Sequence, residues 1–538
     1  MSLPHWKILA LERRAQQQAL IPKEWLLTSS MPSDAVNPKD FIDSLDLLSQ
    51  EEKAITSITD ASALLAKIAS RELSSEQVAR AFCKRAAIAQ QLIKCCTELF
   101  FDRAIQDAKA LDDYLEKTGK LKGPLHGLPI SIKDSFDIEG FDTTIGWVGL
   151  IGKPAPRNGC VAELLLSMGA VIYCKTNIPQ SLMMSDSYNH VFGQSLNALN
   201  KNLVSGGSSG GEGAIVAAQA SIIGIGTDIG GSIRIPAALQ GIYGLMPSAG
   251  RIPWEKSMST QTYIVPPVAG PMTTSLKSLE FFMEEFISTE PWKRDTRALP
   301  IPWRKELADV SGRTLKIGII FDDGVVKPQP PITRALQEVA KRFRAAGHDV
   351  LEWDASSHVQ GLNLWLKAIF ADGGADCQRL CKVVDEPLIQ GMLVGQEKDK
   401  LTRPERQELE KQKYEYRDEI HRQWRESGID ALIMPTVPWV GYPPKVWVES
   451  KQWLGYTAIW NLLDYSVAVV PVTRADASLD APGPEWNSYT PRNESDAFNH
   501  KQYNINLVKN IPIGVQIVTG RFGEEKAIAV AKVLAQLQ

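Results

Sequence analysis

Short apolar runs alternate with helical segments from residue 121 onward, and this alternation limits the fold more than any other feature of the sequence. Residues 160–170 are typical of a helix stopped by Gly169, and residues 170–177 follow as a buried strand. This order of elements predicts an α/β fold. Further strands are predicted at 221–226, 315–320, 349–353, 431–438, 466–473 and 512–518, and further helices after Gly211, after Ser232, at 332–348 and at 524–537.

The first part of the chain, residues 1–120, is expected to be helical. Residues 61–94 carry apolar side chains at helical spacing, and Ser74 with Gln77 fits a capping box. Residues 100–120 form a second amphipathic pattern that ends at a glycine signal. Since no linker divides the rest convincingly, we expect a helical region packed on one large domain of residues 121–538.

Two segments of the C-terminal part are predicted to lie at the surface. Residues 400–427 are long and highly charged, which is typical of a solvated helix. Residues 477–496 are polar and rich in turn-forming residues, which predicts an exposed loop.

Composition excludes several classes of partner. The formal net charge of −3 gives no reason to expect nucleic acid or an anionic membrane. No run approaches the ~18 uncharged apolar residues of a transmembrane helix, and the N-terminus lacks a secretory core. The 7 cysteines include no C-x-x-C pair, and Cys377 with Cys381 lacks a second ligand pair, so we expect free thiols, no metal and a cytoplasmic protein.

Two glycine–serine clusters could carry chemistry, at residues 206–211 and 226–234. A serine after Ile-Gly-Gly, as at Ser232, is suited to nucleophilic attack because the loop's N–H groups can converge on an oxyanion. Neither cluster matches a P-loop or a dinucleotide-binding motif. A pair of purely structural turns is the alternative, which the presence of two such clusters together with Lys133 disfavours.

A nucleophilic serine needs a base, and none of the 7 histidines lies in a recognisable triad motif. The G-x-S-x-G turn of α/β-hydrolases is also absent. Lys133 follows an apolar run, where burial would lower its pKa and make it a base. By itself this position is weak evidence, because most lysines are simply exposed.

Three motifs identify a family resemblance: GLPISIKD at 127–134, GGSSGGEGA at 206–214 and GTDIGGSIRIPAA at 226–238. Together they resemble the amidase signature family, and GPLHGLPIS with the WNLLDYSVAVVPV segment is most similar to the fungal acetamidases. The resemblance covers most of the chain. It implies a mixed central β-sheet covered by helices on both faces.

The resemblance also implies a role for each matched residue. Ser232 would be the nucleophile that forms the acyl-enzyme. Ser208, on a cis peptide bond, would relay its proton, and Lys133 would be the neutral base. The weaker expectations concern nearby residues. The N–H groups of Ile229, Gly230, Gly231 and Ser232 would form an oxyanion hole, and Leu182 would line the substrate site. Ser209 and Thr227 would orient hydroxyls, and Asp228 with Arg234 would form a structural ion pair. Trp453, Tyr456, Trp460 and Asn461 match the region that borders the family's acyl pocket, but aromatic residues there are more often core.

The expected function is hydrolysis of a small aliphatic or aryl carboxamide to a carboxylate and ammonia or an amine. No cofactor is implied, and a homodimer is expected at the level of the family. Four alternatives stay open: a lactam or N-acyl amidohydrolase of secondary metabolism, a fatty acid amide hydrolase, an amidotransferase subunit, and an inactive binding protein.

Overall fold

A computed structural model describes residues 3–254, 264–449 and 453–537. Its centre is an 11-stranded sheet in the order β1-β3-β2-β6-β8-β7-β12-β13-β11-β9-β10. The strands are β1 Cys96–Leu99, β2 Pro129–Lys133, β3 Val171–Thr176, β6 Ile223–Asp228, β7 Tyr243–Met246, β8 Val268–Thr273, β9 Lys316–Ile319, β10 Asp349–Glu352, β11 Ala431–Pro435, β12 Val467–Arg474 and β13 Pro512–Val518. A separate hairpin pairs β4 Tyr188–Asn189 with β5 Gly193–Gln194.

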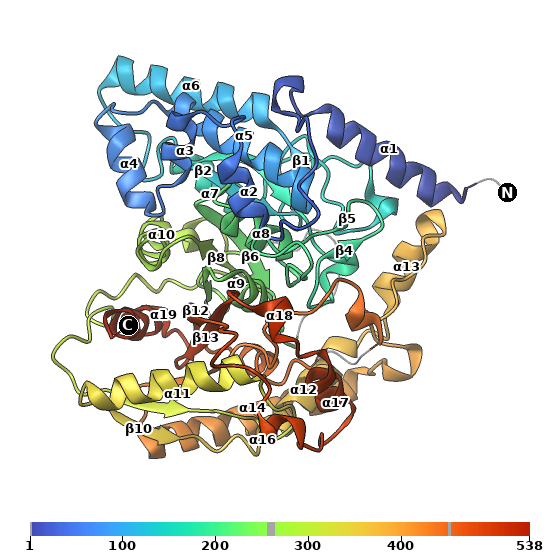
Figure 1. Ribbon diagram of the computed structural model, residues 1–538, viewed down its shortest axis with the longest axis vertical. Coiled ribbons are helices and arrows are strands. Elements are labelled where there is room, and N and C mark those ends of the chain that lie inside the picture. The colour runs from blue at the N-terminus through green and yellow to red at the C-terminus, as the bar shows by residue number, and fades with distance from the viewer. Residues whose placement is uncertain (1–2, 255–263, 450–452, 538) are drawn as a thin grey trace.

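The sheet is mixed, as the resemblance implies. Strands β3, β2 and β6 are parallel neighbours, and so are β11, β9 and β10. The strands between these two groups pair antiparallel, and β1 adds antiparallel at the edge. The N-terminal half, blue to green, and the C-terminal half, yellow to red, therefore meet along one continuous sheet (Figure 1).

Helices cover both faces, and the alternation of side chains along β3 shows why. Ile172 packs into the core shared with α4, α7 and α10, whereas Val171 and Tyr173 pack into the core shared with α5 and α8. Successive side chains of a strand point to opposite faces, so a strand that is apolar throughout must be covered twice. The remaining C-terminal strands are covered in the same way by α11 on one face and α12, α14 and α15 on the other.

The helices predicted from the sequence are present, and further helices lie between them. Ser74 and Gln77 form the predicted capping box of α5, and α6 ends at Gly119 in the left-handed conformation. The helices are α1 His5–Ala19, α2 Pro38–Ser44, α3 Gln50–Thr56, α4 Ala61–Ala69, α5 Ser75–Ile93, α6 Phe101–Thr118, α7 Cys160–Ser167, α8 Gly210–Ala217, α9 Arg234–Gln240, α10 Leu276–Ser288, α11 Pro330–Ala345, α12 His358–Phe370, α13 Ala375–Val384, α14 Arg403–Ser427, α15 Ala458–Leu463, α16 Pro484–Asn487, α17 Glu494–Gln502, α18 Ile505–Val508 and α19 Glu524–Gln536.

Two sequence predictions need correction. The region 1–120 is not wholly helical, because Cys96–Leu99 forms β1 and pairs with β3. The segment 477–496 is not simply an exposed loop, because it contains α16 and buries Trp486 and Asp480. Asp480 accepts hydrogen bonds from Arg334 at 2.7 and 2.9 Å, which anchors the segment to α11.

Candidate active site

Lys133 ends β2, an interior strand of the sheet, and is fully buried. Its Nζ donates to Ser208 Oγ and to Thr227 Oγ1, each at 2.8 Å, and approaches the Thr227 carbonyl at 3.3 Å. Burial lowers the pKa of Lys133 from 10.5 to about 7, although the negative charges of Asp228 and Glu212 oppose the shift. A buried lysine with such a pKa is a base at neutral pH.

Ser208 lies in the first glycine–serine cluster, immediately before α8. The Gly207–Ser208 peptide bond is cis, as the resemblance implies. The chain passes so close to Asp186 here that a Cβ at position 207 would come within 2.5 Å of the Asp186 carbonyl oxygen. Glycine is therefore required at 207, and Ser208 is held with its hydroxyl on Lys133.

Ser232 lies in the short loop between β6 and α9. Its side chain is half-buried, and its carbonyl accepts a hydrogen bond of 3.1 Å from the N–H of Ser209. Ser232 and Gly207 line the same narrow cavity. The fold thus brings together the two clusters that the sequence analysis singled out.

The N–H groups of this loop differ in what they contact. Gly231 N–H donates to Asp228 Oδ1 at 2.7 Å, so it is already engaged as a donor. The N–H groups of Ile229, Gly230 and Ser232 have no acceptor within the described part of the chain. The expected set of four oxyanion donors therefore contains one, Gly231, that serves the loop itself.

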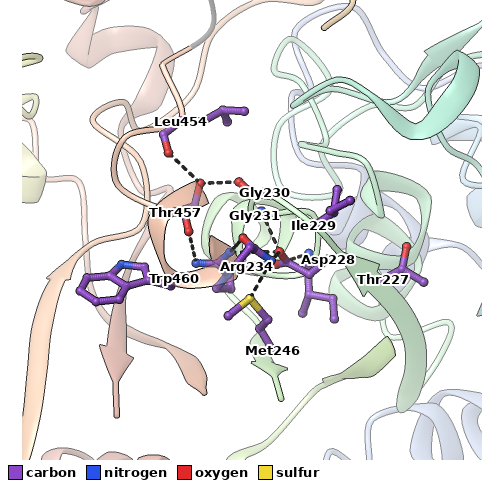
Figure 2. A network of polar contacts seen from close by, with 12 residues as sticks. Thr227, Asp228, Ile229, Gly230, Gly231, Arg234, Met246, Leu454, Thr457 and Trp460 are labelled. Atoms are coloured by element: carbon purple, nitrogen blue, oxygen red, sulfur yellow. Dashed lines mark hydrogen bonds and ion pairs between the residues drawn. The ribbon is translucent and has the colours of Figure 1, made fainter. Parts of the chain in front are cut away.

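Asp228 and Arg234 form the expected ion pair and are both fully buried. The guanidinium donates twice to the carboxylate, from Nε to Oδ2 and from Nη2 to Oδ1, each at 3.0 Å. Burial alone would raise the pKa of Asp228, but the Arg234 charge and the hydrogen bonds to the carboxylate lower it to about 2. The pair stays ionised and ties the loop that carries Ser232, between β6 and α9, to the start of α9 (Figure 2).

Residues far along the chain complete this network, and sequence reasoning did not assign them a role. Asn461 donates to Asp228 Oδ1 at 2.9 Å and accepts from Arg234 at 2.6 Å. Arg234 also reaches the Thr457 carbonyl at 2.9 Å and Gln516 Oε1 at 3.2 Å. The sequence placed Asn461 in a matching region but gave no local signal for Gln516.

Ser209 and Thr227 lie between the two clusters. Ser209 Oγ donates to the Thr227 carbonyl at 3.2 Å and accepts from the Thr227 N–H at 3.3 Å. Since Thr227 Oγ1 also accepts from Lys133, the two hydroxyls connect the lysine to the serine cluster. The orienting roles expected of Ser209 and Thr227 stay predictions.

Glu212 is a second buried group that sequence reasoning missed. It lies on α8, where it accepts hydrogen bonds from Ser131 and, at 2.5 Å, from Thr176. Burial raises the pKa of Glu212 to about 7, against the hydrogen bonds and the charge of Lys133. The charge of Glu212 raises the pKa of Lys133, and that of Lys133 lowers the pKa of Glu212, so the two groups are electrostatically coupled.

A cavity of about 200 Å³ opens beside the loop that carries Ser232, at Ile229. Leu182, which the resemblance places at the substrate site, lines this cavity and also the narrow one that reaches Ser232. Four charged side chains border the cavity, those of Asp372, Asp376, Arg379 and Arg406. Most of the wall is apolar and includes Trp147, Ile229, Ile264, Ile369, Leu380 and Leu393.

Comparison with known proteins shows which family the chain belongs to. The model of the family described as Amidase matches residues 77–528. The chain belongs to the amidase family. Among its relatives, an acetamidase of Emericella nidulans is 38% identical over 99% of this chain and 98% of that protein. An acetamidase of Aspergillus oryzae is 36% identical over the same shares.

A solved structure extends the comparison. A fatty acid amide hydrolase superposes on this amidase with a TM-score of 0.93 at 34% identity, over 99% of this chain and 95% of that one. The amidase fold and the fungal amidase relatives together make the chain an amide hydrolase. Within the described residues, no helix is long and apolar enough to cross a membrane, and none of the seven cysteines forms a disulfide.

Proposed function

We propose that this amidase cleaves its substrate through Ser232, with Ser208 as proton relay and Lys133 as base. The observation that carries the proposal is the fully buried Lys133, 2.8 Å from Ser208 Oγ and with a pKa of about 7. When the amine is neutral, its two N–H groups can serve Thr227 Oγ1 and the Thr227 carbonyl. Its lone pair is then free to accept the proton of Ser208.

In the proposed acylation step, Ser232 Oγ attacks the amide carbonyl carbon while its proton passes to Ser208, whose own proton passes to Lys133. The carbonyl oxygen becomes an oxyanion that backbone N–H groups of the loop stabilise. As the C–N bond breaks, Ser208 gives a proton to the leaving amine and is reprotonated by Lys133. Water then attacks the acyl-enzyme by the same relay and releases the carboxylate.

We infer from the cavity that the acyl group of the substrate is apolar and about as large as a phenyl ring. An apolar cavity of about 150 Å³ is enough to bind benzene, and the cavity here measures about 200 Å³. Each methylene that leaves water contributes about 0.8 kcal/mol, or about fourfold in kcat/KM. An acetyl group would leave most of this space without contacts.

Two experiments test the proposal. Ser232→Ala should abolish labelling by a fluorophosphonate probe, while Ser288→Ala, on the exposed end of α10, should leave it unchanged. Ammonia release should rise from acetamide to hexanamide and benzamide. Labelling of Ser232→Ala would refute the nucleophile, and a preference for acetamide would refute the proposed acyl group.

A long-chain fatty amide is the second candidate substrate, because the structure aligns with a fatty acid amide hydrolase over nearly its whole length. The two candidates differ in the size of the acyl group. Oleamide in the same release assay separates them, since the first candidate predicts a lower kcat/KM for oleamide than for benzamide.

A further inference from the structure

We propose that Trp365 and Thr457 are positioning residues that hold the carbonyl groups of Ile229 and Gly230. Trp365 thereby aims the N–H of Gly230 at the reacting carbonyl, and Thr457 fixes the Gly230–Gly231 peptide group, which lies between the N–H groups of Gly230 and Ser232. The inference rests on the proposed role of Ser232. It assigns a task to two side chains that lie outside the motifs and reach the nucleophile loop from the C-terminal half.

Trp365 reaches the loop from α12. Its side chain is fully buried, and its indole Nε1 donates to the Ile229 carbonyl at 2.8 Å. The ring also covers Gly230 so closely that a Cβ there would come within 2.5 Å of it. A single side chain therefore fixes the orientation of the Ile229–Gly230 peptide group.

Thr457 holds the next carbonyl. Its Oγ1 donates to the Gly230 carbonyl at 2.6 Å, whereas its second possible acceptor, the Leu454 carbonyl, lies at 3.4 Å (Figure 2). Gly231 has a φ of +130°, and a Cβ at this position would come within 2.7 Å of Thr457 Oγ1. The loop needs glycine here because the threonine hydroxyl lies so close.

The planarity of the peptide bond turns these two contacts into directions. In a trans peptide the C=O and the following N–H point in opposite directions. Holding the Ile229 carbonyl therefore sets the N–H of Gly230, and holding the Gly230 carbonyl sets the N–H of Gly231, which meets Asp228. The Gly231 carbonyl accepts from Ile235 N–H at 2.7 Å, which sets the N–H of Ser232.

Three successive carbonyls of the loop thus have donors, and of the three N–H groups that follow them only Gly231 donates to a described residue. Gly230 and Ser232 N–H remain as a preorganised pair of donors, which is the arrangement that stabilises an oxyanion. The same helix that carries Trp365 contributes Ala368 and Ile369 to the wall of the acyl cavity. Trp365 and part of the cavity wall therefore lie on one rigid helix, α12.

The test uses four variants of the full-length protein. Trp365→Phe keeps a ring but removes the N–H donor, and Thr457→Val keeps the shape but removes the hydroxyl. Thr457→Ser restores the hydroxyl. Trp353→Phe is the matched control, because Trp353 packs in the same apolar core and its Nε1 has no hydrogen-bond partner.

Two readouts separate positioning from a loss of packing. The first is the change in kcat and the change in KM, measured separately with benzamide. The second is the Ki of phenyl trifluoromethyl ketone, which forms a hemiketal with a nucleophilic serine and so carries an oxyanion. Removing one oxyanion donor costs about 10²–10³ in kcat, so misdirecting one should cost at least ~10-fold.

We expect Trp365→Phe and Thr457→Val to lower kcat and weaken the ketone by this factor, with KM changed less than about twofold. Thr457→Ser should recover most of the loss, and Trp353→Phe should behave as wild type. An unchanged kcat in both Trp365→Phe and Thr457→Val, or an equal loss of kcat in Trp353→Phe, would overturn the inference. If Trp365→Phe fails to fold, the Thr457→Val and Thr457→Ser pair decides the matter. Failure of the proposed function is a different result: a wild-type enzyme whose labelling survives Ser232→Ala.

Discussion

Replacing Lys133 by methionine should abolish hydrolysis and, near neutral pH, remove a penalty on folding. The pKa of Lys133 is about 7 in the folded protein and 10.5 without the protein environment. Between these values the unfolded chain binds more protons than the folded one, so protonation favours unfolding. The free energy of unfolding of the wild type therefore rises with pH from about 7 to 10.5, and the methionine variant lacks this rise.

The magnitude follows from the two pKa values. At pH 7 the penalty is ~4 kcal/mol relative to a side chain that does not titrate, and at pH 9 it is ~2 kcal/mol. Methionine also loses the hydrogen bonds to Ser208 and Thr227, at ~0.5–1.5 kcal/mol each, but this loss does not change between these pH values. The free energy of unfolding of Lys133→Met minus that of the wild type should thus fall by ~2 kcal/mol from pH 7 to pH 9.

Urea unfolding at pH 7, 8 and 9 measures this difference, with Ser232→Ala as the control. That variant is expected to be inactive too, but it keeps the buried amine and should follow the wild-type profile. A stability difference between Lys133→Met and wild type that is constant from pH 7 to pH 9 would refute the reasoning, because the pKa of Lys133 would then be the same in both states.

Four further predictions concern the same site. Below pH 7, kcat/KM should fall about tenfold per pH unit because Lys133 must be neutral; a profile flat from pH 5 to 8 would contradict this. Glu212→Gln removes a charge that raises the pKa of Lys133, so the acid limb of the pH–rate profile should move to lower pH, and a limb that stays or moves up would refute the coupling. Asp228→Asn leaves the buried Arg234 without its counter-charge and should cost ~3–5 kcal/mol in urea unfolding, where a cost under 1 kcal/mol would argue against the pair. Ile369→Trp should fill the acyl cavity and lower kcat/KM for benzamide more than for acetamide; equal losses would place the acyl group elsewhere.

Sequence reasoning predicted the parts of the site that are local in the chain. Lys133 stands at the end of an apolar run that becomes β2, and Ser208 and Ser232 lie in glycine-rich loops that precede helices. These features depend on neighbouring residues, and the chemistry of each loop is visible in its own composition. The predicted Asp228–Arg234 pair is local in the same sense, because the two residues flank one turn.

The supporting contacts could not be predicted, because they join positions more than 130 residues apart. Trp365 reads as one apolar residue of an amphipathic helix, and its hydrogen bond to Ile229 depends on how α12 lies against the loop. Gln516 reads as one polar residue in a buried strand. The edge strand β1 was missed for another reason, since its four residues are too few to show a periodicity.

The place of Gln516 on β13 has a consequence for how the enzyme is made. Its side chain accepts from Arg234 and donates to the carbonyls of Pro435 and Tyr456, at 2.8 and 2.6 Å, so it joins the nucleophile loop to two C-terminal segments. Both serine clusters leave the ribosome almost three hundred residues before this strand. A nascent chain therefore carries Ser232 long before it carries Gln516, and hydrolytic activity should appear only after β13 has been made.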